Sequence, residues 1–170
     1  MIDVQFTDPH HVTVGWTGQP GERTFFVQAA DESQQVTLLL EKGQVAGLVE
    51  LLTQLLARLG DGPATDWDRA AMALLEPIDP RWRVGGLSVG LDPERGRFVI
   101  EFEEFVGPEA PEDPLELRIW ADQDQARRLA AHAAEQVEQG RPTCQLCGRP
   151  TAADGDHICP ATNGHGRLAQ

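Results

Sequence analysis

The residues with the clearest chemical potential gather near the C-terminal end of the chain. Cys144 and Cys147 are separated by two residues, Cys159 lies 12 positions beyond Cys147, and His157 and His165 stand on either side of Cys159. Two thiolates at this spacing can bind one tetrahedral metal ion from a tight turn. The C-x2-C pattern with a third cysteine and two histidines therefore predicts a zinc site.

The remaining ligands of this zinc site follow from donor type and reach. Cys159 is the only other soft thiolate, which makes it the expected third ligand. His165 lies six residues after Cys159 and has room for its ring to turn back towards the ion. His157 is separated from Cys159 by a single residue, so both could bind only with strained local geometry. We expect His165 as the fourth ligand, with His157 as the alternative.

A structural zinc ion is the preferred interpretation of this cluster. A segment of 30 residues has too little apolar surface to fold alone, whereas metal binding can supply about 10–16 kcal/mol of apparent free energy. A catalytic zinc would keep one coordination position open. A redox pair at Cys144 and Cys147 is disfavoured, because such a motif should open a helix in a βαβ unit and here it follows Gly140-Arg141-Pro142.

A second candidate contact is Arg23, which follows the turn Gly18-Gln19-Pro20-Gly21 and Glu22. A guanidinium can hold a carboxylate or phosphate through two hydrogen bonds. Arg23 is therefore a possible contact for an anion or a partner. A plain turn also explains most of these residue types, so the structural interpretation comes first.

The remaining polar groups are assigned no chemistry. His10 and His11 adjoin a strand start and His132 is expected on the polar side of a helix. The carboxylates between residues 101 and 113 lack the glycine turn and ligand spacing of a calcium loop, so a solvated face is expected. The P-loop, zincin and dinucleotide fingerprints do not occur. Enzymatic activity is thus less expected than a non-enzymatic role.

Charge and composition narrow the class of protein further. The 170 residues include 27 acidic and 14 basic ones, a net charge of −13, which opposes binding to nucleic-acid phosphates and anionic lipid. The first residues lack the basic flank and apolar run of a signal peptide, and the chain has no apolar stretch of membrane-spanning length. The three cysteines lie close together, which suits reduced thiolates in a metal site. We expect a cytoplasmic protein.

The pattern of apolar residues predicts an α+β fold. Three antiparallel strands are expected within residues 10–41, followed by an amphipathic helix that ends at Gly60. A second hairpin spans residues 82–106, a further strand covers 115–120, and Asp122 can cap a helix that ends at Gly140. Residues 61–80 form a connector with a possible short helix at Asp66–Leu75. Each helix should cover the apolar face of an antiparallel sheet.

Two larger divisions follow from this order of elements. Residues 10–60 and 82–140 repeat the same succession of three strands and a helix, which suggests a pseudo-duplicated β-β-β-α arrangement. The tail of residues 141–170 has three arginines against two aspartates, whereas residues 1–140 hold 11 basic and 25 acidic residues. We expect an α+β domain over residues 1–140 and a zinc-ribbon-like module over 141–170.

The chain resembles the bacterial conserved hypothetical proteins of domain-of-unknown-function family 3090. The resemblance covers nearly the whole chain and implies a zinc-ribbon-like tail without a known reaction. Members tend to be encoded near a phosphoinositide-kinase-like and a histidine-phosphatase-like protein, which implies these as partners. The motifs that carry the resemblance are Gly18–Phe25, Glu41-Lys42-x-Gln44-Val45, Arg83-Val84-Gly85, Gly140-Arg141-Pro142-x-Cys144-x-Leu146-Cys147-Gly148 and His157-x-Cys159-Pro160-x-x-Asn163-Gly164-His165.

Taken together, these features predict a cytoplasmic accessory or interaction protein with a structural zinc site. One alternative is an enzyme that acts on a phosphorylated or nucleotide-like small molecule, assisted by the metal or by Arg23. A weaker alternative is nucleic-acid binding through the tail alone.

Overall fold

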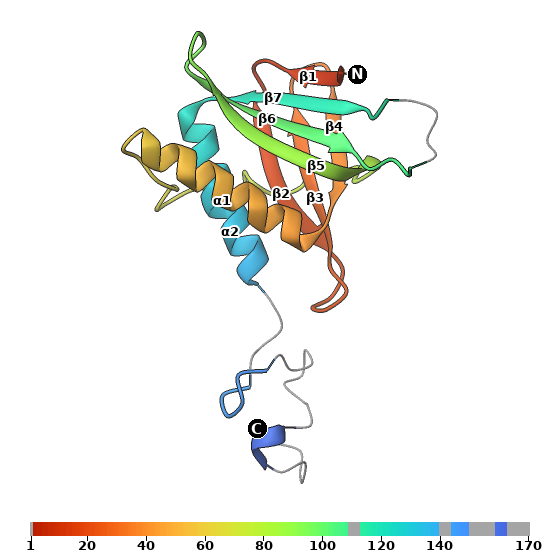
Figure 1. Ribbon diagram of the computed structural model, residues 1–170, viewed down its shortest axis with the longest axis vertical. Helices are drawn as coiled ribbons and strands as arrows, with labels where there is room; N and C mark the ends of the chain where they lie inside the picture. Colours follow the sequence, from red (N-terminus) through yellow and green to blue (C-terminus); the bar gives the residue numbers. More distant parts are fainter. Residues whose placement is uncertain (1, 109–112, 140–143, 150–158, 163–170) are drawn as a thin grey trace.

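The computed structural model describes residues 2–108, 113–139, 144–149 and 159–162 (Figure 1). Seven strands and two α-helices make up the fold, and a short 3-10 helix follows Cys159. The α+β class is confirmed. In chain order the elements are β1 (Ile2–Phe6), β2 (His11–Thr17), β3 (Thr24–Ala30), β4 (Gln35–Leu40), α1 (Lys42–Arg58), β5 (Pro80–Asp92), β6 (Arg97–Glu104), β7 (Glu116–Ala121), α2 (Gln123–Glu138) and η1 (Pro160–Thr162).

The strands form one mixed sheet in the order β1-β7-β6-β5-β4-β3-β2. Strands β2 to β4 and strands β5 to β7 are two antiparallel meanders, and each is followed by its helix as the repeat predicted. The prediction of a purely antiparallel sheet was wrong in two places, because β1 pairs with β7 and β4 pairs with β5 in parallel. Strand β1 was not predicted, because its run of alternating apolar and polar residues is too short to indicate a strand.

The sheet must curl until its two ends approach each other. Strands β1 and β2 lie at opposite ends of the strand order, yet only residues 7–10 separate them in the chain. Such a connection spans at most about 18 Å. Seven strands side by side in a flat sheet would spread over about 29 Å. The short connection therefore holds the sheet in a strongly curved, barrel-like shape, with β1 running into β2 (Figure 1).

The two halves correspond strand by strand. Thr37 in β4 and Arg118 in β7 each lie four residues before the residue that caps the following helix. Thr37 pairs in parallel with Pro80, and Arg118 pairs in parallel with Gln5. Gln5 and Pro80 therefore hold matching positions, and the single long strand β5 corresponds to β1 and β2 together.

The first turns of the helices repeat this correspondence at the level of single hydrogen bonds. Gln44, the third residue of α1, accepts from the amide of the N-cap residue at 2.8 Å and donates to the Val84 carbonyl at 2.9 Å. Gln125, the third residue of α2, accepts from its N-cap amide at 3.0 Å and donates to the Pro9 carbonyl at 2.6 Å. Val84 and Pro9 each lie four residues beyond the matched pair Pro80 and Gln5. Each helix start is thus tied to the other half, α1 to β5 and α2 to the link between β1 and β2.

The two helices lie side by side against the sheet, and each packs on a strand of the other half. Helix α1 packs on β5, and α2 packs mainly on β2 and less on β6 and β7, so each helix covers a strand of the opposite half (Figure 1). Their buried faces correspond as well: Val45, Leu48 and Leu52 in α1, and Ala126, Leu129 and Ala133 in α2. The smaller side chains of α2 let the two helices share one interface with the sheet.

The predicted end of α1 at Gly60 and the predicted start of α2 at Asp122 are confirmed, whereas the end predicted at Gly140 lies outside the described residues. Gly60 has a φ of 72°, its amide donates to Ala57 and the Asp61 amide donates to Leu56, both at 3.0 Å. This pair of bonds satisfies carbonyls at the end of α1 and needs a residue that tolerates the left-handed conformation. At the start of α2 the Asp122 carboxylate accepts from the Gln125 amide at 2.7 Å.

The connector between α1 and β5 crosses the outer face of β2, β3 and β4. Thr13, Gln28 and Thr37 form one row across these strands. The Gln28 side chain donates to the Leu75 carbonyl at 2.8 Å, accepts from the Leu75 amide at 2.7 Å and donates to Thr37 Oγ1 at 2.9 Å, while Thr13 Oγ1 donates to the Met72 carbonyl. The short helix expected at 66–75 is wrong, because the structure has turns there and these strand side chains bind the backbone instead.

Candidate metal centre and neighbouring sites

The three cysteines converge although Cys159 is far from the other two in sequence. All three Sγ atoms lie within 4.8 Å of one another, and those of Cys144 and Cys159 are 3.8 Å apart. This distance is far longer than the roughly 2.05 Å of a disulfide, and none of the three cysteines is in a disulfide. Cys144 and Cys159 are buried. The arrangement can hold a metal ion.

The sulfur spacing fits a tetrahedral thiolate site. Metal–sulfur bonds of about 2.3 Å at tetrahedral angles place two sulfurs about 3.8 Å apart. The distance between Cys144 Sγ and Cys159 Sγ has this value. The donor set therefore passes a geometric test for a zinc-like ion.

Gly148 closes the turn that carries the first two cysteines. The Gly148 amide donates to the Cys144 carbonyl at 2.8 Å, the Cys144 amide donates to the Arg149 carbonyl at 2.9 Å, and Gly148 has a φ of 68°. The amides of Cys147 and Leu146 donate to the Cys144 sulfur and hold the pKa of this thiol below its ordinary value, against the opposing effect of burial. The backbone thus favours a thiolate at Cys144.

The neighbouring thiols make Cys147 harder to ionise. The Arg149 amide lowers the pKa of Cys147, but burial and the neighbouring thiols Cys159 and Cys144 outweigh it and raise that pKa overall. A cation among the sulfurs would remove this repulsion. Both candidate fourth ligands, His157 and His165, lie outside the described residues.

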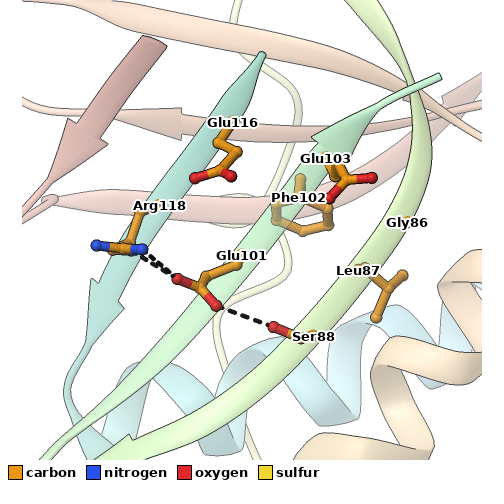
Figure 2. Close-up of a pocket in the computed structure, with 8 residues that line it drawn as sticks. All are labelled: Gly86, Leu87, Ser88, Glu101, Phe102, Glu103, Glu116 and Arg118. Atoms are coloured by element: carbon orange, nitrogen blue, oxygen red, sulfur yellow. Dashed lines mark hydrogen bonds and ion pairs between the residues drawn. The ribbon is translucent and has the colours of Figure 1, made fainter. Parts of the chain in front are cut away.

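A separate hollow of about 380 Å³ lies on the outer face of β5, β6 and β7 (Figure 2). Ser88, Glu101 and Arg118 form a row across the three strands. Ser88 Oγ donates to Glu101 Oε2 at 3.1 Å, and the Arg118 guanidinium holds Glu101 Oε1 at 2.6 Å. Glu103 and Glu116 face each other in the next row.

The family of the chain is shown by its sequence. A model described as Protein of unknown function (DUF3090) matches residues 4–159. The chain belongs to this family. No curated protein and no solved structure matches it. The DUF3090 match contains all three cysteines and His157, and it ends before His165. The resemblance inferred from the motifs is confirmed.

One pattern in this DUF3090 chain was missed at the level of sequence. Gly86-Leu87-Ser88-Val89-Gly90 fits G-x-S-x-G, the motif of a hydrolase nucleophile. That motif needs a sharp turn between a strand and a helix, whereas these residues lie inside the extended strand β5. Ser88 contacts a carboxylate that is already ion-paired with Arg118, which makes that carboxylate a poor base. The pattern is therefore not a catalytic serine site.

The acidic residues do not converge on a cation. In the described part of the chain, the cysteines are the group of His, Cys, Asp and Glu that comes close enough to share an ion. Glu103 and Glu104 lie on β6 and Asp113 is exposed, while Glu109 and Glu112 lie outside the described residues. Glu103 and Asp113 are exposed, as expected for a solvated face.

Arg23 stacks on an aromatic ring. Its guanidinium carbon lies 3.9 Å from the centroid of Trp16, a cation–π contact between the two ends of the β2–β3 hairpin. The buried Nε atom of Arg23 has no hydrogen-bond acceptor among the described residues. The stacking gives Arg23 a structural role, and the contact with an anion or partner stays a prediction.

Two histidines that sequence reasoning left on the surface are buried. His11 is 8% exposed and His132 is 5% exposed, so the expected polar surroundings of His132 were wrong. Trp67 Nε1 donates to His132 Nδ1 at 3.2 Å, which ties the connector to α2. No sequence pattern pairs Trp67 with His132, because 65 residues separate them in the chain.

No helix among the described residues is long and apolar enough to cross a membrane.

Acidification should destabilise the fold through these two histidines. Burial lowers the pKa of His11, as does the nearby His10, and burial lowers the pKa of His132 against the opposing effects of Glu135 and the Val14 carbonyl. The unfolded chain therefore binds protons first, and stability present above pH 6.5 is lost as the pH falls below it. Urea unfolding at pH 7.5 and pH 5 measures this loss.

A matched variant separates the histidines from other titrating groups. His132→Asn should be less stable at pH 7.5 but should lose less stability between pH 7.5 and pH 5 than the original chain. The lowered pKa values of Asp31, Asp61 and Asp92 act in a different window, below about pH 3.8. An equal slope in both proteins would contradict the assignment.

Proposed function

We propose that this DUF3090 protein is an accessory or interaction protein whose C-terminal segment folds around a structural zinc ion. The observation that carries the proposal is the convergence of the Cys144, Cys147 and Cys159 sulfurs at the spacing of a tetrahedral thiolate site. His165 would complete the site, with His157 as the alternative. The ion would supply a fixed cross-link between two parts of the tail.

Zinc is favoured over other metals by the donor set. Three thiolates select soft or borderline metals, and a nitrogen from imidazole in fourth place suits zinc. Zinc also has no redox chemistry, so it can serve as a permanent brace. Calcium and magnesium require oxygen donors, which this group of cysteines does not offer.

The interaction role is supported by the surface near the site. Leu146, between the two cysteines of the turn, is 58% exposed. An apolar side chain at the tip of a metal-braced turn is a suitable anchor for a protein partner. The family resemblance points to a phosphoinositide-kinase-like or a histidine-phosphatase-like protein as the partner, within the cytoplasm.

X-ray absorption on the purified full chain tests the proposal. We expect one zinc per chain, bound by three sulfurs and one nitrogen, with no exchangeable water. His165→Ala should weaken zinc binding more than His157→Ala, and the reverse order would assign the fourth position to His157. A zinc with a water ligand would instead favour the enzyme that acts on a phosphorylated or nucleotide-like molecule. A chain that binds no zinc would refute the proposal.

A further inference from the structure

The hollow on β5, β6 and β7 corresponds to a face that is already occupied in the other half of the molecule. Ser88, Glu101 and Arg118 hold the positions of Thr13, Gln28 and Thr37, because Arg118 and Thr37 match and both rows follow the same strand pairing. In the first half, this row binds backbone groups of the connector at Met72 and Leu75. The internal repeat therefore shows what such a row can bind.

The connector also packs a leucine side chain directly against a glycine of β2. Leu74 lies against Gly15, where an added Cβ would come within 2.6 Å of the Leu74 side chain. Gly90 holds the position of Gly15 in the second half, since it lies two residues after Ser88 as Gly15 lies two after Thr13. An added Cβ at Gly90 would meet nothing within 4 Å. The second face thus keeps room for an apolar side chain at the matching place.

The second face carries carboxylates where the first face carries side-chain amides. Gln28 and Gln35 donate to connector carbonyls, and their counterparts are Glu101 and Glu116. Carboxylates accept but do not donate hydrogen bonds. The second face therefore suits an occupant that brings cations and N–H donors.

Two neighbouring carboxylates strengthen this preference for a cationic occupant. Glu103 and Glu116 are directly opposite on neighbouring strands, an arrangement that costs stability in a sheet. Figure 2 shows both carboxylates at the same end of the hollow. A cationic side chain beside them would be attracted to both carboxylates.

We propose that the outer face of β5, β6 and β7 is a docking site for a basic segment of a partner protein, which places an apolar residue over Gly90 and lysine or arginine beside Glu103 and Glu116. This inference deepens the proposed interaction role and rests on it, but it does not depend on the zinc site. The occupant is recognised by its charge and by its backbone groups, in the way that the connector is held on the first half.

The test uses the full, zinc-loaded chain labelled with nitrogen-15 and two synthetic peptides. One is the acetylated hexapeptide amide Ala-Leu-Thr-Lys-Lys-Ala, in which the leucine and the lysines follow the spacing of Leu74 and the connector positions near Gln28 and Gln35. The other replaces both lysines by glutamate. We expect the basic peptide to shift the amide signals of Gly86, Ser88, Glu101 and Glu116, to bind less tightly in high salt, and the acidic peptide to shift none of them.

A charge variant and a matched control complete the test. Glu103→Gln with Glu116→Gln should weaken peptide binding about tenfold while unfolding at the same or a higher temperature, because the facing charges are gone. Glu32→Gln with Glu50→Gln removes the same charge from exposed positions elsewhere and should leave binding unchanged. Equal weakening by both pairs would show a non-specific charge effect and overturn the proposal.

Other outcomes also decide the question. Peptide shifts confined to other elements, or no binding at millimolar peptide, would overturn the proposal. If the Glu103→Gln, Glu116→Gln variant without peptide shifted the signals of residues 144–149, the face would belong to this chain's own tail and the proposal would fall. Zinc content measured on the same samples distinguishes these failures from a failure of the proposed function, since the zinc site can stand while the docking site fails.

Discussion

Replacing Cys144 by serine should abolish stoichiometric zinc binding and leave the thermal unfolding of the sheet unchanged. Cys144 is buried, lies 3.8 Å from the Cys159 sulfur and receives two backbone N–H bonds. Loss of a partner that only orients a metal ligand typically costs 10–100-fold in metal affinity, so loss of a thiolate ligand should cost at least a hundredfold. Zinc titration against a competing chelator measures the change.

The unfolding curve tests the predicted division of the chain at residue 140. The hydrogen bonds of the cysteine turn join residues within residues 144–149, and the core of the sheet is built from β1 to β7, α1 and α2. Chelator-treated original protein provides the control, because it lacks the metal but keeps all three thiols. A fall of the melting temperature by many degrees in both proteins would show that the tail is part of the folded domain.

Replacing Gln28 by leucine should lower the free energy of unfolding by about 2–3 kcal/mol. Gln28 is fully buried, and its amide satisfies both the carbonyl and the amide of Leu75 as well as Thr37 Oγ1. Leucine fills a similar volume but leaves these groups without their partner, and an unsatisfied buried polar group costs about 1–3 kcal/mol. Urea unfolding at pH 7.5 gives the difference.

Gln35 offers a matched control for this substitution. Gln35 is exposed and donates to the Leu75 and Pro77 carbonyls at 3.3 and 3.1 Å. Gln35→Leu makes the same chemical change where water can replace the lost bonds, so it should cost less than about 1 kcal/mol. Hydrogen exchange at the Leu75 amide should rise in the Gln28 variant. Equal costs for the two variants would mean that Gln28 does not anchor the connector.

The internal repeat connects the Gln28 prediction with the proposed docking site. The row of Thr13, Gln28 and Thr37 binds a segment of the same chain, and the matching row of Ser88, Glu101 and Arg118 presents a hollow with excess acid. The same arrangement of strands thus serves stability in one half and is available for a partner in the other. The substitution of glutamine by glutamate at two matched positions marks the difference.

The candidate metal ligands show what a local sequence pattern can and cannot predict. The spacing of Cys144 and Cys147 with Gly148 predicts a tight turn beneath two sulfurs, because every contact involved is a few bonds away along the chain. The approach of Cys159 is predicted by donor type, and the structure bears it out. The histidines cannot be ranked by spacing alone, since the path of the chain between ligands decides their reach.

The sequence by itself determined the two helices, their capping residues Asp122 and Gly60, the three-strand meanders and the cysteine turn. Periodicity, caps and turn residues act over at most one or two turns, so they can be read without knowing the rest of the chain. Only the tertiary structure decided the parallel pairs, the exchange of helices between halves, the burial of His132 and the hollow on β5, β6 and β7. These features depend on which segments pack together although they are distant in sequence. The free energy of the whole fold determines that packing.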